Sequence, residues 1–198
     1  MKVLPLHPEN PQKRLIAEAV KVFKQGGLVI YPTDSGYSIG CDAHNVKAIQ
    51  KLYQAKRHIK KYWMALLVSE FSSIPEFALV NNKAFKAMKQ VMPGPYTFIL
   101  PAQMDIIRKL KVKRKEIGVR MSKHPVVKGL FEGGVGPILN TAARLEEDLD
   151  YTDNDELIKH FKGVGDLFLD IGELQLNPTS IINFTDGYPE VLRGEWPY

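Results

Sequence analysis

Side chains that can bind an anion recur near the ends of the strands that the sequence predicts. The candidates are hydroxyl and cationic residues: Thr33, Ser35, Lys56, Arg57, His58, Arg120, Thr141, Thr179, Ser180 and Arg193. The sequence contains neither G-x-x-x-x-G-K-[ST] nor G-x-G-x-x-G, so neither standard phosphate-binding loop is present. A phosphate would therefore have to be bound by these side chains and by backbone N–H groups.

Arg120 is the least ordinary of these candidates. It ends the run Ile117-Gly-Val-Arg120, which reads as a buried strand. A buried guanidinium needs a partner because its charge is costly to remove from water. Two explanations remain open, an anionic ligand or a structural ion pair.

The stretch Leu28-Val-Ile-Tyr-Pro-Thr-Asp-Ser-Gly-Tyr37 raises a related question, because a buried strand runs directly into a proline. Pro32 cannot donate to a sheet ladder, so we expect the strand to end or bulge there. The hydroxyls that follow would then lie at the carboxyl end of the strand, where ligands bind in open α/β sheets. The alternative is a hairpin or loop punctuated by proline and glycine.

The elements that would position these residues alternate irregularly. We predict a helix that starts at Asn10-Pro11 and stops at Gly26-Gly27, and a second helix from Asn45 to Ala55. Further strands are predicted at 28–31, 63–68, 96–100, 117–121, 138–141, 167–171, 180–184 and 191–193, with helices near 82–92, 125–132 and 153–161. This order predicts one α/β domain over residues 1–198, without the strict βαβ repeat of a Rossmann domain.

Composition excludes several classes of protein. Cys41 is the only cysteine and the five histidines are scattered, so we predict no disulfide and no structural metal. No apolar run approaches the roughly 20 residues of a membrane span, and the first residues do not form a signal peptide. We therefore expect a cytoplasmic protein with no membrane partner.

Charge is unevenly distributed along the chain. Residues 101–128 carry nine basic and two acidic side chains, whereas residues 145–173 carry ten acidic and two basic ones. A basic face could meet a polyanion such as RNA, and the alternative is two oppositely charged solvated surfaces.

Several segments, taken in order, resemble one known family. They are Gly26–Gly40, Lys56-Arg-His, Pro93-Gly-Pro-Tyr-Thr-Phe-Ile-Leu100, Ile117-Gly-Val-Arg-Met-Ser-Lys-His-Pro125, Pro137-Ile-Leu-Asn-Thr-Ala142, Asn177-Pro-Thr-Ser-Ile-Ile-Asn183 and Leu192-Arg-Gly194. Together they resemble the YrdC/YciO family, and Pro-Thr-Asp-Ser-Gly-Tyr resembles its YciO branch. The resemblance covers nearly the whole chain.

The resemblance implies a twisted mixed sheet with flanking helices around a concave, basic cavity. The YrdC branch makes threonylcarbamoyl-AMP from ATP, L-threonine and bicarbonate for t6A modification of tRNA, and members of the family are described as binding double-stranded RNA and tRNA. ATP or AMP would bind in this cavity, and Mg²⁺ would accompany ATP. The matched positions would be Thr33 and Tyr37 for the threonine and adenylate, Lys56 and Arg120 for catalysis, and Arg57, His58, Thr141, Ser180 and Arg193 for binding.

The chain departs from the synthase pattern at two motifs and at one position of a third. The K-x-R motif reads Lys56-Arg57-His58, and the S-x-N motif reads Ala142-Ala143-Arg144. The proline of G-x-R-x-P is replaced by Ser122. The retained cavity residues and the resemblance imply a nucleotide-binding and RNA-binding relative, and these changes predict that its synthase activity is weak or altered. The alternative is a non-catalytic module for double-stranded RNA or tRNA.

Overall fold

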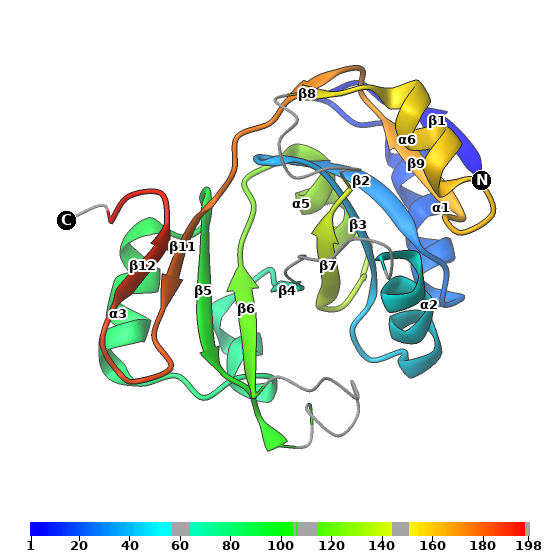
Figure 1. The fold of residues 1–198 in the computed structure, drawn as a ribbon. Helices are drawn as coiled ribbons and strands as arrows, with labels where there is room; N and C mark the ends of the chain where they lie inside the picture. Colours follow the sequence, from blue (N-terminus) through cyan, green and yellow to red (C-terminus); the bar gives the residue numbers. More distant parts are fainter. Residues whose placement is uncertain (57–63, 105, 107–114, 144–150, 197–198) are drawn as a thin grey trace.

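A computed structural model describes residues 1–56, 64–104, 106, 115–143 and 151–196 of the 198-residue chain. Figure 1 shows helices on both sides of a large twisted sheet. In chain order the elements are β1 Lys2–Pro5, α1 Lys13–Lys24, β2 Val29–Thr33, β3 Gly36–Asp42, α2 Val46–Lys56, β4 Ala65–Leu67, the 3₁₀ helix η1 Phe71–Glu76, α3 Asn82–Val91, β5 Tyr96–Pro101, β6 Glu116–Arg120, α5 Pro125–Glu132, β7 Ile138–Ala142, β8 Tyr151–Thr152, α6 Asn154–Phe161, β9 Leu167–Asp170, β10 Leu174–Gln175, β11 Ser180–Asn183 and β12 Glu190–Arg193.

The main sheet has ten strands in the order β1-β9-β2-β3-β7-β4-β6-β5-β11-β12. The sheet contains both parallel pairs, such as β1 with β9 and β4 with β6, and antiparallel pairs, such as β2 with β3 and β5 with β6. The short strands β8 and β10 form a separate antiparallel pair. The predicted mixed α/β class is therefore confirmed.

Each face of the sheet has its own apolar core. On one face, side chains of α1 and α5 pack over Val29 and Tyr31 of β2, Leu67 of β4 and Ile138 of β7. On the other face, α2, α3 and α6 pack over alternate residues of the same strands. Successive residues of a strand point to opposite faces, so the position of a polar residue along its strand decides on which face of the sheet its side chain lies. We call the face covered by α1 and α5 the α5 face, and the face covered by α2, α3 and α6 the α2 face.

Local sequence explains where the helices lie. Leu15, Ile16, Ala19, Val20 and Phe23 recur at helical spacing on α1 and are all buried. Gly26 adopts φ 77°, a conformation that glycine allows at little cost just after a helix. At the start of α5, Pro125 occupies the first turn, where its missing N–H does no harm.

The prediction that the first strand ends or bulges at Pro32 is wrong. β2 continues through Pro32 and Thr33, which pair with Tyr37 and Gly36 of β3. Neighbouring strand β9 pairs with β2 only at Val29 and Ile30, so a residue at position 32 can lack an N–H without breaking a ladder on that side. The hairpin alternative holds, with Asp34 and Ser35 at its tip.

The other predicted elements agree with the structure to within a few residues, where it describes them. The predicted strand at 63–68 shortens to β4, and residue 63 lies outside the described residues. Sequence reasoning missed β1, η1 and the short pair β8 and β10. Within the described part of the chain, no helix combines the length and apolar character needed to cross a membrane.

Candidate anion-binding site

The tip of the β2–β3 hairpin is fixed by the Thr33 hydroxyl. Thr33 is buried, and its Oγ1 donates to the Gly36 carbonyl at 2.7 Å. The same oxygen accepts from the Ser35 N–H at 3.2 Å and lies 3.1 Å from Ser35 Oγ. Gly36 has φ 106°, which a residue with a side chain rarely adopts. The turn therefore presents Asp34 and Ser35 in one fixed arrangement.

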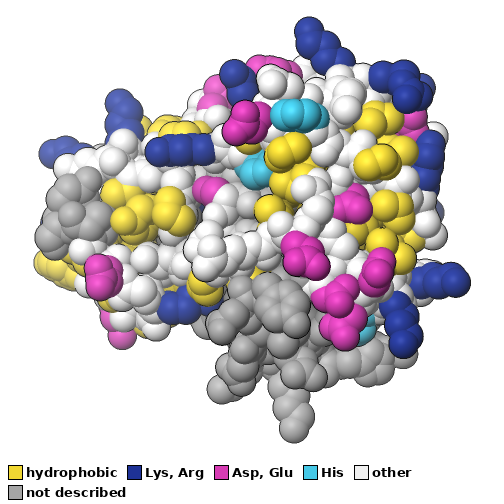
Figure 2. Space-filling view, turned by 90° about the horizontal axis from the view of Figure 1, so that it is seen from above, with side chains coloured by type: hydrophobic (Ala, Val, Ile, Leu, Met, Phe, Trp, Pro, Cys, Tyr) yellow, Lys and Arg dark blue, Asp and Glu magenta, His cyan; other side chains and the backbone are white. Residues whose placement is uncertain are grey.

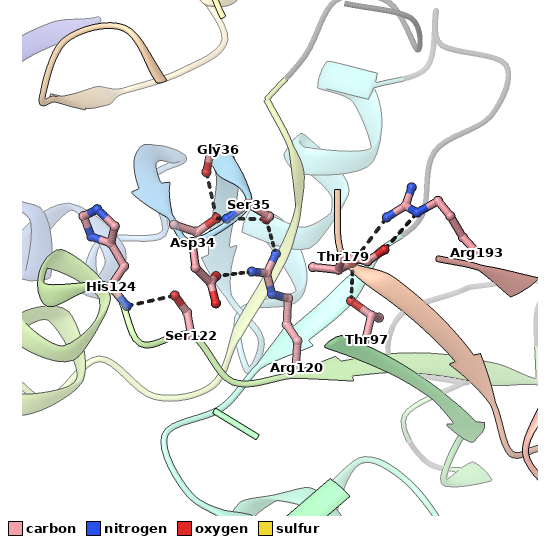
Figure 3. Close-up of polar contacts among 10 residues, drawn as sticks. Asp34, Ser35, Gly36, Thr97, Arg120, Ser122, His124, Thr179 and Arg193 are labelled. Atoms are coloured by element: carbon pink, nitrogen blue, oxygen red, sulfur yellow. Dashed lines mark hydrogen bonds and ion pairs between the residues drawn. The ribbon is translucent and has the colours of Figure 1, made fainter. Parts of the chain in front are cut away.

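Arg120 reaches this tip from the other half of the sheet. Its Nη2 lies 2.6 Å from Asp34 Oδ1, and its Nη1 donates to Ser35 Oγ at 2.9 Å (Figure 3). In the sheet order, β6 is four strands away from β2. Four steps across a flat sheet would cover about 19 Å, so the contact requires a strongly curled sheet. Arg120 lies on the α5 face, because it is the register partner of Leu67, which is buried in that core. Since a side chain on the α5 face makes the contact across the four strands, the α5 face is the concave side of the sheet.

Of the two explanations for a buried arginine at position 120, the structure shows the ion pair, with Asp34 as the partner. Its side chain is only 7% exposed, and that of Asp34 is 19% exposed. The pair is incomplete, because Arg120 Nε and Asp34 Oδ2 are both buried without a hydrogen-bond partner. A buried polar atom without a partner is costly, so it indicates either a water molecule or a ligand group at this place.

A second polar group lies beside Arg120, on β5, on the residue before β11 and on β12. Figure 3 shows Arg120 between the hairpin tip and this group. Thr97 Oγ1 lies 3.0 Å from Thr179 Oγ1, and Thr97 is next to Arg120 in the β5–β6 register. Arg193 donates through Nε to the Thr179 carbonyl at 2.9 Å and through Nη2 to Thr179 Oγ1 at 3.2 Å. Arg193 is exposed, so its charge is accessible from solvent.

Ser180 follows this group in β11. Its Oγ accepts from the Glu195 N–H at 3.2 Å. Gly194, with φ 74°, packs directly against it, since a Cβ at this glycine would lie 2.4 Å from Ser180 Oγ. The loop 194–195 therefore approaches Ser180 closely, and only glycine fits at 194.

His124 borders the hairpin tip at the start of α5. Its Nδ1 accepts from the Val126 N–H at 3.2 Å and caps the helix, while its own N–H donates to Ser122 Oγ at 3.2 Å. Burial lowers the pKa of His124, although the nearby carboxylate of Asp34 acts in the opposite direction. The neutral imidazole is therefore favoured, and it is the form whose Nδ1 can accept the capping bond.

Three predicted site residues lie on the α2 face instead of the α5 face. Tyr37 is buried in that core, and its hydroxyl donates to the Gly172 carbonyl at 2.7 Å and accepts from the Ile171 N–H at 2.9 Å. Burial raises its pKa to about 12. Thr141 is buried and pairs with Ile39. Lys56, also buried, donates from Nζ to the Ala142 carbonyl at 2.9 Å.

The Lys56 contact brings together the two motifs that depart from the synthase pattern. The first position of the K-x-R motif touches the backbone of the first position of the S-x-N motif. Arg57, His58 and Arg144 lie outside the described residues. Where a synthase motif has a hydroxyl, this chain has the methyl group of Ala142 and a carbonyl that accepts from lysine.

Sequence reasoning missed the partners of the two arginines. Asp34 was visible only as one letter of a motif, Thr179 was a candidate hydroxyl without a predicted partner, and Thr97 was not singled out. A pattern of hydroxyls on neighbouring strands gives no local signal, because β5 and β11 pair across more than 80 residues of chain. Within the described residues, no group of three or more His, Cys, Asp or Glu side chains could hold a metal ion.

The fold and this polar face define a mixed α/β protein with an arginine-centred site on the concave side of its sheet. Residues 21–194 match the Sua5/YciO/YrdC family model, which is described as telomere recombination. The chain belongs to this family, as the sequence motifs predicted.

Relatives with known names span both branches. YciO of Escherichia coli, described as uncharacterized, is 35% identical over 190 residues, which cover 95% of this chain and 92% of that protein. Its crystal structure matches with a TM-score of 0.84 over 98% of this chain and 95% of that one. Threonylcarbamoyl-AMP synthase of Coxiella burnetii is 31% identical over 132 residues, covering 66% of this chain and 71% of that protein.

A more distant structure shares the fold. Sua5 of P. abyssi, solved in complex with L-threonine, matches with a TM-score of 0.85 at 23% identity. The match covers 98% of this chain and 57% of that one.

Proposed function

We propose that this protein binds ATP or AMP on the concave α5 face and has weak or altered threonylcarbamoyl-AMP synthase activity. The observation that supports the proposal is the convergence of Arg120, Arg193 and the hydroxyls of Thr33, Ser35 and Thr179 on one face. Guanidinium groups bind phosphate through paired hydrogen bonds, and hydroxyls add neutral donors beside them. Family membership makes a nucleotide the first candidate among phosphate ligands.

The expected weakness of the synthase reaction follows from the changed motifs. Charge develops on the leaving pyrophosphate, so a synthase needs fixed donors where that charge grows. Ala142 offers no hydroxyl there, and the buried ammonium of Lys56 donates to the Ala142 carbonyl. L-threonine and bicarbonate are proposed as co-substrates, with Mg²⁺ arriving bound to the phosphates of ATP. We also propose a cytoplasmic location, as expected for a relative of tRNA-modifying synthases.

RNA binding has less support from the described residues. Five of the nine basic side chains that suggested it, those of residues 108–114, lie outside them. On the face shown in Figure 2, lysine and arginine side chains lie mainly around the rim, and several acidic side chains gather within it. The proposal that the protein is a non-catalytic module for double-stranded RNA or tRNA therefore stays second.

Calorimetric titration of ATP tests the proposal. Arg193→Ala should weaken binding roughly 10- to 150-fold, the equivalent of losing a charge-assisted hydrogen bond of about 1.5–3 kcal/mol. Arg193 is exposed, so the variant should fold normally. Lys86→Ala, an exposed lysine on α3, is the matched control and should leave the affinity unchanged. Equal affinity in wild type and Arg193→Ala would remove this site.

A further inference from the structure

One face of helix α3 carries positive charge that no ion pair neutralises within the described part of the chain. Lys83, Lys86 and Lys89 are all exposed, and α3 contains no acidic residue. None of the three forms a salt bridge with another described residue. The opposite side of the helix packs into the core through Ala84 and Met88, so the lysines point away from the sheet.

Two aromatic rings border this lysine face, one on each side. Phe85 is 38% exposed and meets Phe71 of η1 edge to face, with 5.7 Å between the ring centroids. Tyr188, in the turn between β11 and β12, is 68% exposed. This turn lies against the start of α3, because a Cβ at Gly187 would lie 3.6 Å from Asn81 Nδ2. The lysines therefore lie between two exposed rings.

A lysine ammonium group lies over each of the two rings. Lys83 Nζ is 4.0 Å from the centroid of the Tyr188 ring, and Lys89 Nζ is 5.7 Å from that of the Phe85 ring. At these distances an aromatic ring attracts a cation, so the contacts hold two otherwise flexible side chains in place. A charge that is already held loses less conformational freedom when it binds an anion. The face is therefore arranged to bind anionic groups.

The position of Lys83 strengthens the preference for an anion. Lys83 is the second residue of α3, and the N-terminus of a helix carries partial positive charge, so a lysine in the first turn is unfavourable. The side chain of Asn81 accepts from the Ala84 N–H at 2.8 Å, but this neutral cap leaves the positive charge in place. An acidic group from another molecule would interact favourably with both the lysine and the helix end.

The rings and the lysine spacing distinguish among anionic partners. Single-stranded nucleic acid stacks its bases on open ring faces, but Lys83 covers a face of Tyr188. A membrane surface needs apolar side chains that insert, but Phe85 packs on Phe71. Aromatic residues are enriched where proteins bind proteins. Lysines three residues apart rise by about 4.5 Å along α3, which matches carboxylates three or four residues apart on a second helix.

We propose that Lys83, Lys86 and Lys89, with Phe85 and Tyr188, form a docking surface for an acidic amphipathic helix of a partner protein. The carboxylates of that helix meet the lysines, and its apolar side chains pack beside the two rings. The docking surface lies on the α2 face of the sheet, whereas the proposed nucleotide site lies on the α5 face. The two proposals are therefore independent.

The test is a fluorescence-anisotropy titration with a labelled helical peptide that carries glutamate at every third or fourth position and leucine beside it. Wild type should bind this peptide saturably, and should bind a peptide with glutamine in place of glutamate about tenfold more weakly. Lys83→Glu with Lys86→Glu and Lys89→Glu should weaken binding at least about tenfold, because attractive charge pairs become repulsive. Tyr188→Ala, which removes a bordering ring, should weaken it about fivefold.

A matched control reverses three exposed lysines on α1 and α2, which lie on the other side of the molecule from α3 in Figure 1. Lys13→Glu with Lys24→Glu and Lys47→Glu changes the net charge equally and should bind the peptide like wild type. Absence of saturable peptide binding, or equal loss in both triple variants, would overturn the proposal. Tighter binding of duplex RNA, or of vesicles of equal parts phosphatidylserine and phosphatidylcholine, than of the peptide would overturn it in favour of a nucleic acid or a membrane.

Discussion

The ion pair between Arg120 and Asp34 should stabilise the curled sheet, and its removal gives a prediction with a defined magnitude. In Arg120→Met, the Asp34 carboxylate loses its partner at 2.6 Å, while its second oxygen already has none. Breaking a buried pair from one side typically costs 3–5 kcal/mol. Asp34 is 19% exposed, so water can partly compensate, and we expect the lower end, about 3 kcal/mol.

A double-mutant cycle measures the pair itself. Asp34→Asn keeps an acceptor oxygen for Arg120 and should cost about 1 kcal/mol. The double variant Asp34→Asn with Arg120→Met leaves no unpaired charge. Its loss of free energy of unfolding should therefore be smaller than the sum of the two single losses by about 1–2 kcal/mol. In a chain of this size, a loss of about 3 kcal/mol corresponds to a melting temperature lower by about 6–12 °C.

Urea denaturation of the four proteins supplies the free energies of unfolding. Lys128 and Glu132 form the control pair, 3.7 Å apart on α5 with side chains 74% and 68% exposed. An exposed helical pair of this kind should couple by only about 0.3–0.5 kcal/mol. If the Arg120–Asp34 coupling were no larger than that of the control, the pair would not connect the two halves of the sheet as described.

Three further predictions concern local features. His124→Asn keeps a capping side chain that does not titrate. Wild type should lose stability as pH falls below about 6.5, because the histidine of the unfolded chain takes up a proton before the buried one does, and the variant should lose less. An unchanged dependence of the free energy of unfolding on pH, measured by urea denaturation at several pH values, would refute this. Gly194→Ala should lower the melting temperature more than Gly163→Ala, because both glycines have positive φ but only at Gly194 would a Cβ meet Ser180. Equal decreases in melting temperature would exclude the steric contribution. Binding of tRNA, if it occurs, should weaken steeply between 50 and 200 mM salt, and salt-independent affinity in a filter-binding assay would contradict an electrostatic interaction.

The regular elements could be predicted because their signals are local. Buried positions at helical spacing and apolar runs between glycines and prolines gave α1, α2, α3 and most strands. Pro32 misled because the rule against proline in a strand applies only where a neighbour needs its N–H, and pairing with β9 stops at Ile30. That boundary depends on a strand more than 130 residues away.

The site was predictable only in part, for a similar reason. Arg120 was recognisable as a buried arginine that needs a partner, and the ion-pair alternative was kept open. Its partner Asp34 is 86 residues away in the chain and four strands away in the sheet. The division of Thr33, Tyr37 and Thr141 between two faces depends on register, which spacing along a single strand does not reveal.

We propose above all that the chain keeps a nucleotide site but has lost most of the synthase chemistry. The most direct measurement is pyrophosphate release with ATP, L-threonine and bicarbonate, run beside the C. burnetii synthase and beside an ATP titration. We predict saturable ATP binding with release at least about 100-fold slower than that of the synthase, since one missing donor to developing charge typically costs 10²–10³ in rate. Turnover comparable to the synthase, or no ATP binding at all, would contradict the claim.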